Sequence, residues 1–192
     1  MSIYITYFNG LVWGLFLLFS LPIHALELPE PSSISQVSDD YFLKSTFLLN
    51  LVRFIEWPDE PMPKPEPLYF CFFGNDSFGT ALDNIREKTV RGRELIIRKN
   101  IAFFEIKTCH LLFIDASKKE ELNSILEATA NYPILTVGDT PDFASAGGLV
   151  NLINYQGRIM LEINIDAAQR TQLRISSRLL SLARLIEEKR SQ

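Results

Sequence analysis

Three short segments made almost wholly of apolar residues set the tightest limit on how this chain can fold. They span residues 68–73, 111–114 and 134–137. Segments that are apolar on both faces are typical of strands covered by helices on either side of a sheet. Helix-like sequence lies between them, over 77–88 and over 117–131, where Ser117 and Glu120 form a capping-box pattern. This alternation predicts an α/β fold with a mainly parallel central sheet, to which residues 95–98 add a further strand.

An amphipathic helix is expected ahead of the first strand. Its apolar stripe recurs at spacings of four and three residues, through Leu43, Phe47, Leu51 and Phe54. Asp39 or Asp40 can cap its start. Proline disfavours helical geometry in the residue before it, so Pro58 is expected to end the helix at or before Trp57. The sequence therefore predicts a core helix that closes on an aromatic side chain.

The end of the chain predicts an antiparallel hairpin followed by one long final helix. The hairpin joins residues 149–154 to residues 158–165 through a turn at Tyr155-Gln156-Gly157. Apolar and polar residues alternate in its second strand, so Ile159, Leu161, Ile163 and Ile165 are expected to face the core, and Arg158, Met160, Glu162 and Asn164 to face outward. The final helix is expected to begin near Asp166 and to dock through Leu179, Leu182 and Ile186.

Residues 1–25 have the pattern of a signal peptide. They contain no charged side chain, and their apolar run over 11–21 ends near Ile23-His24-Ala25. The first ten residues lack lysine and arginine, and an uncut leader would be long enough to span a bilayer, so a retained membrane anchor stays open. Residues 26–38 predict a flexible lead-in, which leaves 39–192 as a single domain.

Composition and residue spacing argue against several classes of function. The net charge of −4 and the lack of a basic cluster do not suit nucleic acid. After the leader the chain has one histidine, His110, which adjoins Cys109 on a strand where neighbouring side chains point to opposite faces. No catalytic dyad, metal or cofactor is therefore expected. A small-molecule pocket beyond the first strand, at Gly74, stays open.

The two cysteines suggest a disulfide. An exported chain that holds only Cys71 and Cys109 would expose both to an oxidising compartment. A bond between residues this far apart would stabilise the fold by roughly 4 kcal/mol through the entropy of the unfolded chain. Two buried thiols that never meet are the alternative.

Two polar groups are candidates for docking a partner protein. The first joins Phe143 and the loop up to Gly148 with Arg158, Glu162 and Asn164, and would present an exposed aromatic in a polar patch. The second is a stripe of Arg170, Arg174 and Arg178, which repeats every fourth residue on the expected final helix. A solvated strand face with an ordinary turn, and a solvated helix face, are the simpler interpretations.

Several motifs occur in an order and spacing that resemble a known family. They are Lys44-Ser45-Thr46-Phe47 with Arg53-Phe54 and Trp57-Pro58, Cys71 with Gly74, Cys109-His110-Leu111-Leu112, Leu135-Thr136-Val137-Gly138-Asp139 with Phe143 and Gly147-Gly148, and the blocks at 158–164 and 173–180. From about residue 40 to residue 186 the chain is similar to the YfiR/HmsC family of periplasmic regulators. A cysteine pair at these places also fits that resemblance.

The resemblance implies a non-enzymatic repressor. Such a protein binds the periplasmic sensor region of a membrane diguanylate cyclase and lowers cyclic-di-GMP and biofilm formation. It also implies a homodimer and release by an outer-membrane partner. A periplasmic domain that senses a small ligand for a transporter or sensor kinase is the alternative function. A hydrolase would need a histidine-supported nucleophile, which the sequence does not provide.

Overall fold

The computed structural model describes residues 33–58, 66–156 and 158–187. The expected signal peptide, residues 1–25, and the first part of the expected lead-in lie outside these described residues. Residues 33–38, assigned to the lead-in from the sequence, are helical.

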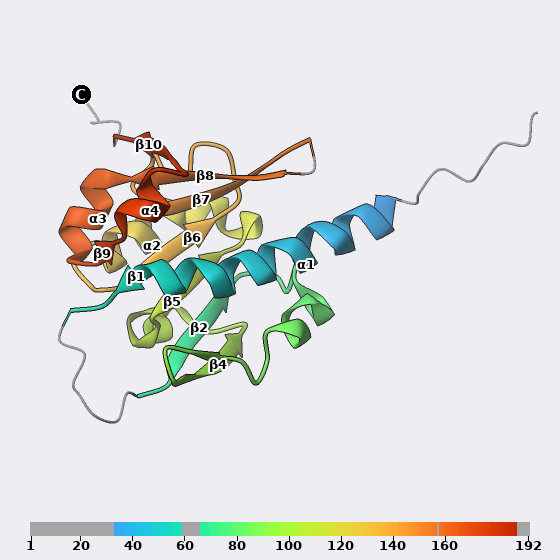
Figure 1. The fold of residues 1–192 in the computed structure, drawn as a ribbon. Helices are drawn as coiled ribbons and strands as arrows, with labels where there is room; N and C mark the ends of the chain where they lie inside the picture. Colours follow the sequence, from blue (N-terminus) through green and yellow to red (C-terminus); the bar gives the residue numbers. More distant parts are fainter. Residues whose placement is uncertain (1–32, 59–65, 157, 188–192) are drawn as a thin grey trace, which may run out of the picture. The chain divides into compact units, whose positions relative to one another are not determined.

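An eight-stranded sheet organises the described part of the chain (Figure 1). Its strand order is β10-β8-β7-β6-β5-β2-β4-β3. In chain order the strands are β2 (Leu68–Phe73), β3 (Thr89–Val90), β4 (Arg93–Lys99), β5 (Leu111–Ile114), β6 (Leu135–Gly138), β7 (Val150–Tyr155), β8 (Arg158–Asn164) and β10 (Arg184–Ile186). Neighbours run parallel except at the β7–β8 and β3–β4 pairs. The mainly parallel sheet and the antiparallel hairpin are thus confirmed.

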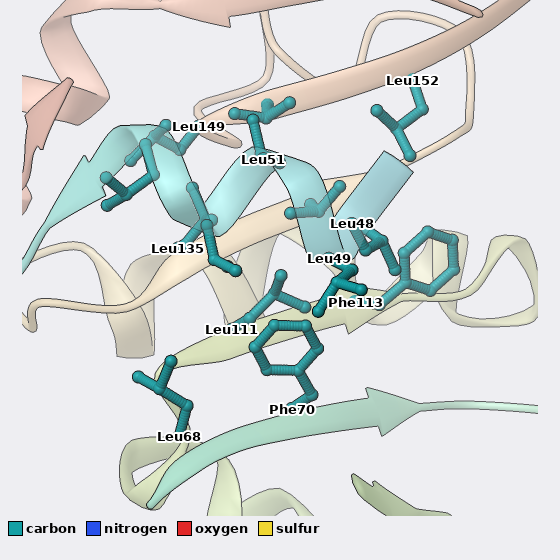
Figure 2. Packing of buried hydrophobic residues seen from close by; sticks show 14 of the residues in the cluster. Leu48, Leu49, Leu51, Leu68, Phe70, Leu111, Phe113, Leu135, Leu149 and Leu152 are labelled. Carbon is teal, nitrogen blue, oxygen red and sulfur yellow. The ribbon is translucent and has the colours of Figure 1, made fainter. Parts of the chain in front are cut away.

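Strand β5 shows why helices must cover both faces of this sheet. Leu111 and Phe113 pack in one cluster with α1 (Ser33–Leu51), whereas Leu112 and Ile114 pack in another with α2 (Leu122–Thr129). Alternate residues of a strand point to opposite faces, so a strand that is apolar throughout needs cover on each. Figure 2 shows the α1 leucines beside the strand residues of the first cluster, among them Leu48, Leu51, Phe70 and Leu135.

The first helix is longer at its start and shorter at its end than the sequence predicted. It begins at Ser33, so Asp39 and Asp40 lie inside it and do not cap it. It ends at Leu51 and tightens into a 3₁₀ turn, η1 (Val52–Phe54). The chain then becomes extended as β1 (Ile55–Glu56), which pairs antiparallel with β9 (Arg174–Ile175). The main-chain pairing at Ile55, three residues before Pro58, therefore ends the helical geometry.

The connections after β2 and β5 are shorter helices than predicted. The segment expected to be helical over 77–88 forms only η2 (Gly79–Asn84). The segment over 117–131 divides into η4 (Ala116–Glu121) and α2. Asp115, and not Ser117, provides the cap, because its carboxylate accepts a hydrogen bond from the Ser117 amide at 2.8 Å. The connection between β4 and β5 contains η3 (Phe103–Thr108).

The prediction of one long final helix is wrong. The chain after β8 forms α3 (Ile165–Thr171), then β9, α4 (Ser177–Leu180) and β10. Gln172 takes a left-handed conformation that ends α3, and the Ser176 hydroxyl caps α4. Of the expected docking stripe, Leu179 is buried but Leu182 is 72% exposed. Strand pairing at both β9 and β10 outweighs the helical propensity of this segment.

Candidate functional site

A polar cleft of about 930 Å³ opens beyond the carboxyl end of β6. Open sheets of parallel strands place ligand crevices at this end. Charged residues line it from three parts of the chain: Lys44 of α1, Asp139 and Asp142 after β6, and Glu162, Arg184 and Glu187 near the β8–β10 edge.

Lys44 ties α1 to the sheet at this cleft. Its ammonium lies 2.7 Å from the Asp139 carboxylate and 2.5 Å from that of Asp40, one helical turn earlier. Burial alone would lower the pKa of Lys44, but the hydrogen bonds and charges of Asp139 and Asp40 outweigh it and raise the pKa above its usual value. The lysine is therefore a fixed cation that positions the cleft wall.

Glu162 forms the opposite wall of the cleft. The sequence predicted that Glu162 faces solvent, but it is only 6% exposed, and its carboxylate pairs with Arg184 of β10. The Asn151 side-chain amide also donates to it at 3.0 Å. The same amide donates to the Thr140 carbonyl oxygen at 3.0 Å. The alternation rule fails here because Asn151 of β7 and Arg184 of β10, the neighbours of Glu162 on the two adjacent strands, both bind its carboxylate.

Phe143 is fully buried, so the prediction of an exposed aromatic is wrong. Gly138 and Gly148 flank its ring. A Cβ atom on Gly148 would lie 2.1 Å from the ring, and one on Gly138 would lie 2.4 Å from it. The two glycines therefore make the slot that Phe143 fills. Gly147 has a φ of +109°, a conformation that favours glycine.

Asn164 is fully buried and binds the loop after β6, which contains Phe143. Its side-chain amide donates to the Ala144 carbonyl oxygen at 2.6 Å, while its side-chain oxygen accepts from the Ala167 amide at 2.9 Å and caps α3. Because its donor and its acceptor are both used inside the fold, Asn164 organises the loop and cannot contact a partner directly.

The predicted arginine stripe is divided among three elements. Arg170 lies in α3, Arg174 in β9 and Arg178 in α4. Arg174, Arg178 and the hairpin residue Arg158 are exposed. Of the residues expected to dock a partner, these three therefore remain on the surface.

The amino ends of β2 and β5 form a second polar centre, around His110. Cys71 of β2 is disulfide-bonded to Cys109, which confirms the predicted pairing. His110 Nδ1 accepts a hydrogen bond from the Tyr69 amide at 3.2 Å, and Nε2 lies 3.0 Å from the Arg93 guanidinium. Burial lowers the pKa of His110 to about 4, and the Arg93 charge acts in the same direction.

Trp57 contributes to this centre from beyond β1. It is buried, and its ring meets the His110 ring edge-on, with 6.0 Å between centroids.

The other residues of the 53–58 signature lie nearby in the chain. Phe54 lines an apolar groove of about 340 Å³ between α1, β8 and α4. The Arg53 carbonyl oxygen accepts from Arg91 at 2.9 Å, and Pro58 is half-buried. The signature at 53–58 thus joins the first helix to the amino edge of the sheet.

A family model described as YfiR/HmsC-like matches residues 41–184. The chain belongs to this family. The disulfide, the His110 centre and the Phe143 slot all lie within these residues. YfiR/HmsC-like proteins are periplasmic regulators of diguanylate cyclase signalling, and the family is not a known family of enzymes.

Two further structural findings bear on this YfiR/HmsC-like protein. Within residues 33–58, 66–156 and 158–187, no three histidine, cysteine or carboxylate side chains are grouped so as to hold a metal ion. In the same part of the chain, no helix combines the length and the apolar character needed to cross a membrane.

At Gly74, where the sequence left a small-molecule pocket open, the backbone packs against the start of η4. A Cβ atom there would lie 2.8 Å from Asp115 Cβ, and the Asn75 amide donates to the Ser117 hydroxyl at 3.1 Å. The cleft beyond β6 was not expected. Asp139 directly follows a buried strand, and Lys44 lies one turn after Asp40, so the sequence did contain a signal for it.

Proposed function

We propose that this protein is a periplasmic repressor that binds the periplasmic sensor region of an inner-membrane diguanylate cyclase. Its membership of the YfiR/HmsC-like family carries this proposal. Repression then lowers cytoplasmic cyclic-di-GMP and biofilm formation. A regulator can shift a cyclase only by binding its inactive state more tightly than its active state.

The structure supports a role for a rigid surface. Phe143 and Asn164 fix the loop after β6, and the Lys44–Asp139 pair fixes that loop to α1. A surface held in one geometry loses little conformational entropy on binding. We propose that the exposed residues Arg158, Arg174 and Arg178 contact an acidic surface of the sensor, because arginine is enriched among residues that dominate interfaces.

Copurification with the cyclase tests this function. The candidate is a membrane protein encoded beside this gene that has a periplasmic sensor and a cytoplasmic diguanylate cyclase domain. Deleting the regulator should raise cyclic-di-GMP. Arg178→Glu should weaken binding at least about fivefold if this arginine is an interface anchor. Arg86→Glu is the matched control, because Arg86 is also exposed and its side chain pairs with the nearby Asp83 of η2. Equal effects of the two variants would remove Arg178 from the interface, and no binding by the wild type would contradict the function.

The expected homodimer and its release by an outer-membrane protein belong to the same proposal. Sedimentation of the purified regulator gives its oligomeric state. A releasing partner should lower the fraction of regulator that copurifies with the cyclase. Neither result depends on the arginine variants, so the three parts of the proposal fail separately.

The cleft beyond β6 favours a second candidate, a domain that senses a small polar ligand for a transporter or sensor kinase. Asn151 is fully buried, and its side-chain oxygen has no hydrogen-bond partner within the described residues. Its amide contacts Thr140 and Glu162, which line the cleft. Thermal melts against small polar metabolites test this role. A ligand-dependent shift in a protein that does not bind the cyclase would favour it.

A further inference from the structure

Two consecutive phenylalanines stand exposed at the start of η3. Phe104 is 83% exposed, the largest fraction of any large apolar side chain in the described residues, and Phe103 is 45% exposed. Exposed apolar side chains that are neighbours, unlike scattered ones, mark an interaction surface. We call Phe103, Phe104 and Lys107 the aromatic tip.

Two lysines lie over aromatic rings at or next to the aromatic tip. Lys107 lies over the Tyr132 ring at 4.5 Å. Lys118 lies over the Phe73 ring at 5.0 Å, and that ring in turn meets the Phe103 ring, with 6.4 Å between centroids. Through the Phe73 ring, the aromatic tip therefore lies next to a second lysine, Lys118, in η4 after β5.

The local charge opposes that of the whole chain. Residues 98–108 contain Arg98, Lys99 and Lys107 against one acid, Glu105, so three positive charges less one negative give +2, whereas the whole chain has −4. The Glu105 carboxylate is engaged by the Ala102 amide at 2.7 Å. Lys99 pairs with Asp76 and Lys118 with Glu121. Arg98 and Lys107 instead contact the hydroxyls of Thr108 and Tyr132.

We propose that the aromatic tip binds the surface of an anionic phospholipid membrane. The phenylalanine rings would enter the boundary between headgroups and acyl chains, and the flanking cations would meet lipid phosphates. Protein interfaces are depleted in lysine, whereas interfacial membrane contacts combine exposed aromatics with lysine and arginine. The acidic remainder of the chain is repelled by the same surface, so the tip sets the orientation of the protein. This proposal does not rest on cyclase binding and can fail independently of it.

Cosedimentation with vesicles tests the aromatic tip. The purified protein and all variants keep the same N terminus, so any lipid contact made by that end is common to every sample. Vesicles containing phosphatidylglycerol should bind more protein than vesicles of phosphatidylcholine alone. Phe104→Ala and Lys107→Glu should each weaken binding to the anionic vesicles by at least about fivefold. High salt should weaken it as well, because charges at the surface are screened.

Matched controls separate the tip from general effects of charge and apolarity. Leu182→Ala removes another exposed apolar side chain, and Lys88→Glu reverses another exposed lysine. Both should bind vesicles as the wild type does. Binding unaffected by Phe104→Ala, or equal for both vesicle types, would overturn the proposal. So would self-association in the absence of lipid that is lost in Phe104→Ala, because the tip would then be an interface between copies. Since Phe104 is so exposed, its variant should melt at the wild-type temperature.

Discussion

The carboxyl ends of the central parallel strands, called here the carboxyl edge, and their amino ends, the amino edge, are held in different ways. At the carboxyl edge, Phe143 fills a slot between Gly138 and Gly148, and neutral hydrogen bonds from Asn164 and Asn151 close the loop around it. At the amino edge, a disulfide stands next to His110, whose ring nitrogens both face donors.

This comparison separates stability that comes from shape from stability that comes from covalent and electrostatic chemistry. Packing in a glycine-lined slot depends little on pH or redox state. The amino edge depends on both, because it contains a reducible bond and a titratable ring in contact with a cation. Reductant and acid should therefore act on the amino edge, whereas the glycine slot should not respond to either, although the Lys44–Asp139 ion pair beside the slot also carries charge.

The largest expected effect is removal of the bond between Cys71 and Cys109, which lie 38 residues apart in sequence. The Cys71→Ala/Cys109→Ala variant should lose up to about 4 kcal/mol of unfolding free energy, because its unfolded chain is no longer constrained. Chemical denaturation of both proteins measures the loss.

Reductant provides the control for the disulfide. It should lower the stability of the wild type toward that of the double variant and leave the double variant unchanged. Reductant without effect on the wild-type melting temperature would show that the amino edge does not depend on the bond.

Filling the glycine slot should cause the next largest loss of stability. Gly148→Ala places a methyl group 2.1 Å from the Phe143 ring and should destabilise the protein by about 3 kcal/mol through overpacking. In a Phe143→Ala background, where the ring is absent, the same substitution should cost much less. A double-mutant cycle by denaturation measures this coupling.

Gly79→Asn is the matched control for the slot. Apart from Gly79 and its two chain neighbours, no atom of the described residues lies within 4 Å of a Cβ built at Gly79, and its φ of +49° is one that asparagine tolerates. This variant should change stability little. A cost for Gly148→Ala that persists without the Phe143 ring would place the strain in the backbone and remove shape as the explanation.

The core of the fold could be predicted from the sequence. Segments apolar on both faces require cover on both faces, so Leu68–Phe73 and Leu111–Ile114 form strands with the predicted bounds. The cysteine pair was also predictable, because two cysteines allow one intramolecular bond. These features depend on local pattern or on count alone.

The candidate site was less predictable because long-range contacts decide it. Glu162 and Asn164 alternate as outward residues should, but Asn164 binds a loop twenty residues earlier in the chain, and Glu162 binds side chains of β7 and β10. Phe143 has no local pattern that places it inside, since its slot is made by glycines on both sides of the loop. The C-terminal segment has helical periodicity, but pairing of Ile175 with Ile55 and of Arg184 with Glu162 replaces the helix with strands.

The smallest of these effects is a dependence of stability on pH at His110. A neutral imidazole can accept only one hydrogen bond, yet the Tyr69 amide and the Arg93 guanidinium both point donors at it. A protonated ring can accept neither. Burial is the main cause that lowers the pKa of His110 from its ordinary value of 6.5 to about 4, and the Arg93 charge acts in the same direction.

The sign of the pH effect follows from that lowered pKa. Between pH 6.5 and 4 the unfolded chain binds a proton on His110 that the folded chain does not, so stability is full above pH 6.5 and falls as the pH drops toward 4. Because the ring is half-buried, we expect a loss of about 2 kcal/mol over this range. His110→Gln keeps an acceptor but cannot titrate, so the difference in unfolding free energy between wild type and variant should shrink or reverse as the pH falls. Denaturation midpoints measured from pH 7.5 to 4.5 test this, and carboxylates and His24 are common to both proteins and cancel in the difference. Parallel curves for the two proteins would show that Arg93 and Tyr69 do not hold His110 neutral, and the amino edge would then depend on the disulfide alone.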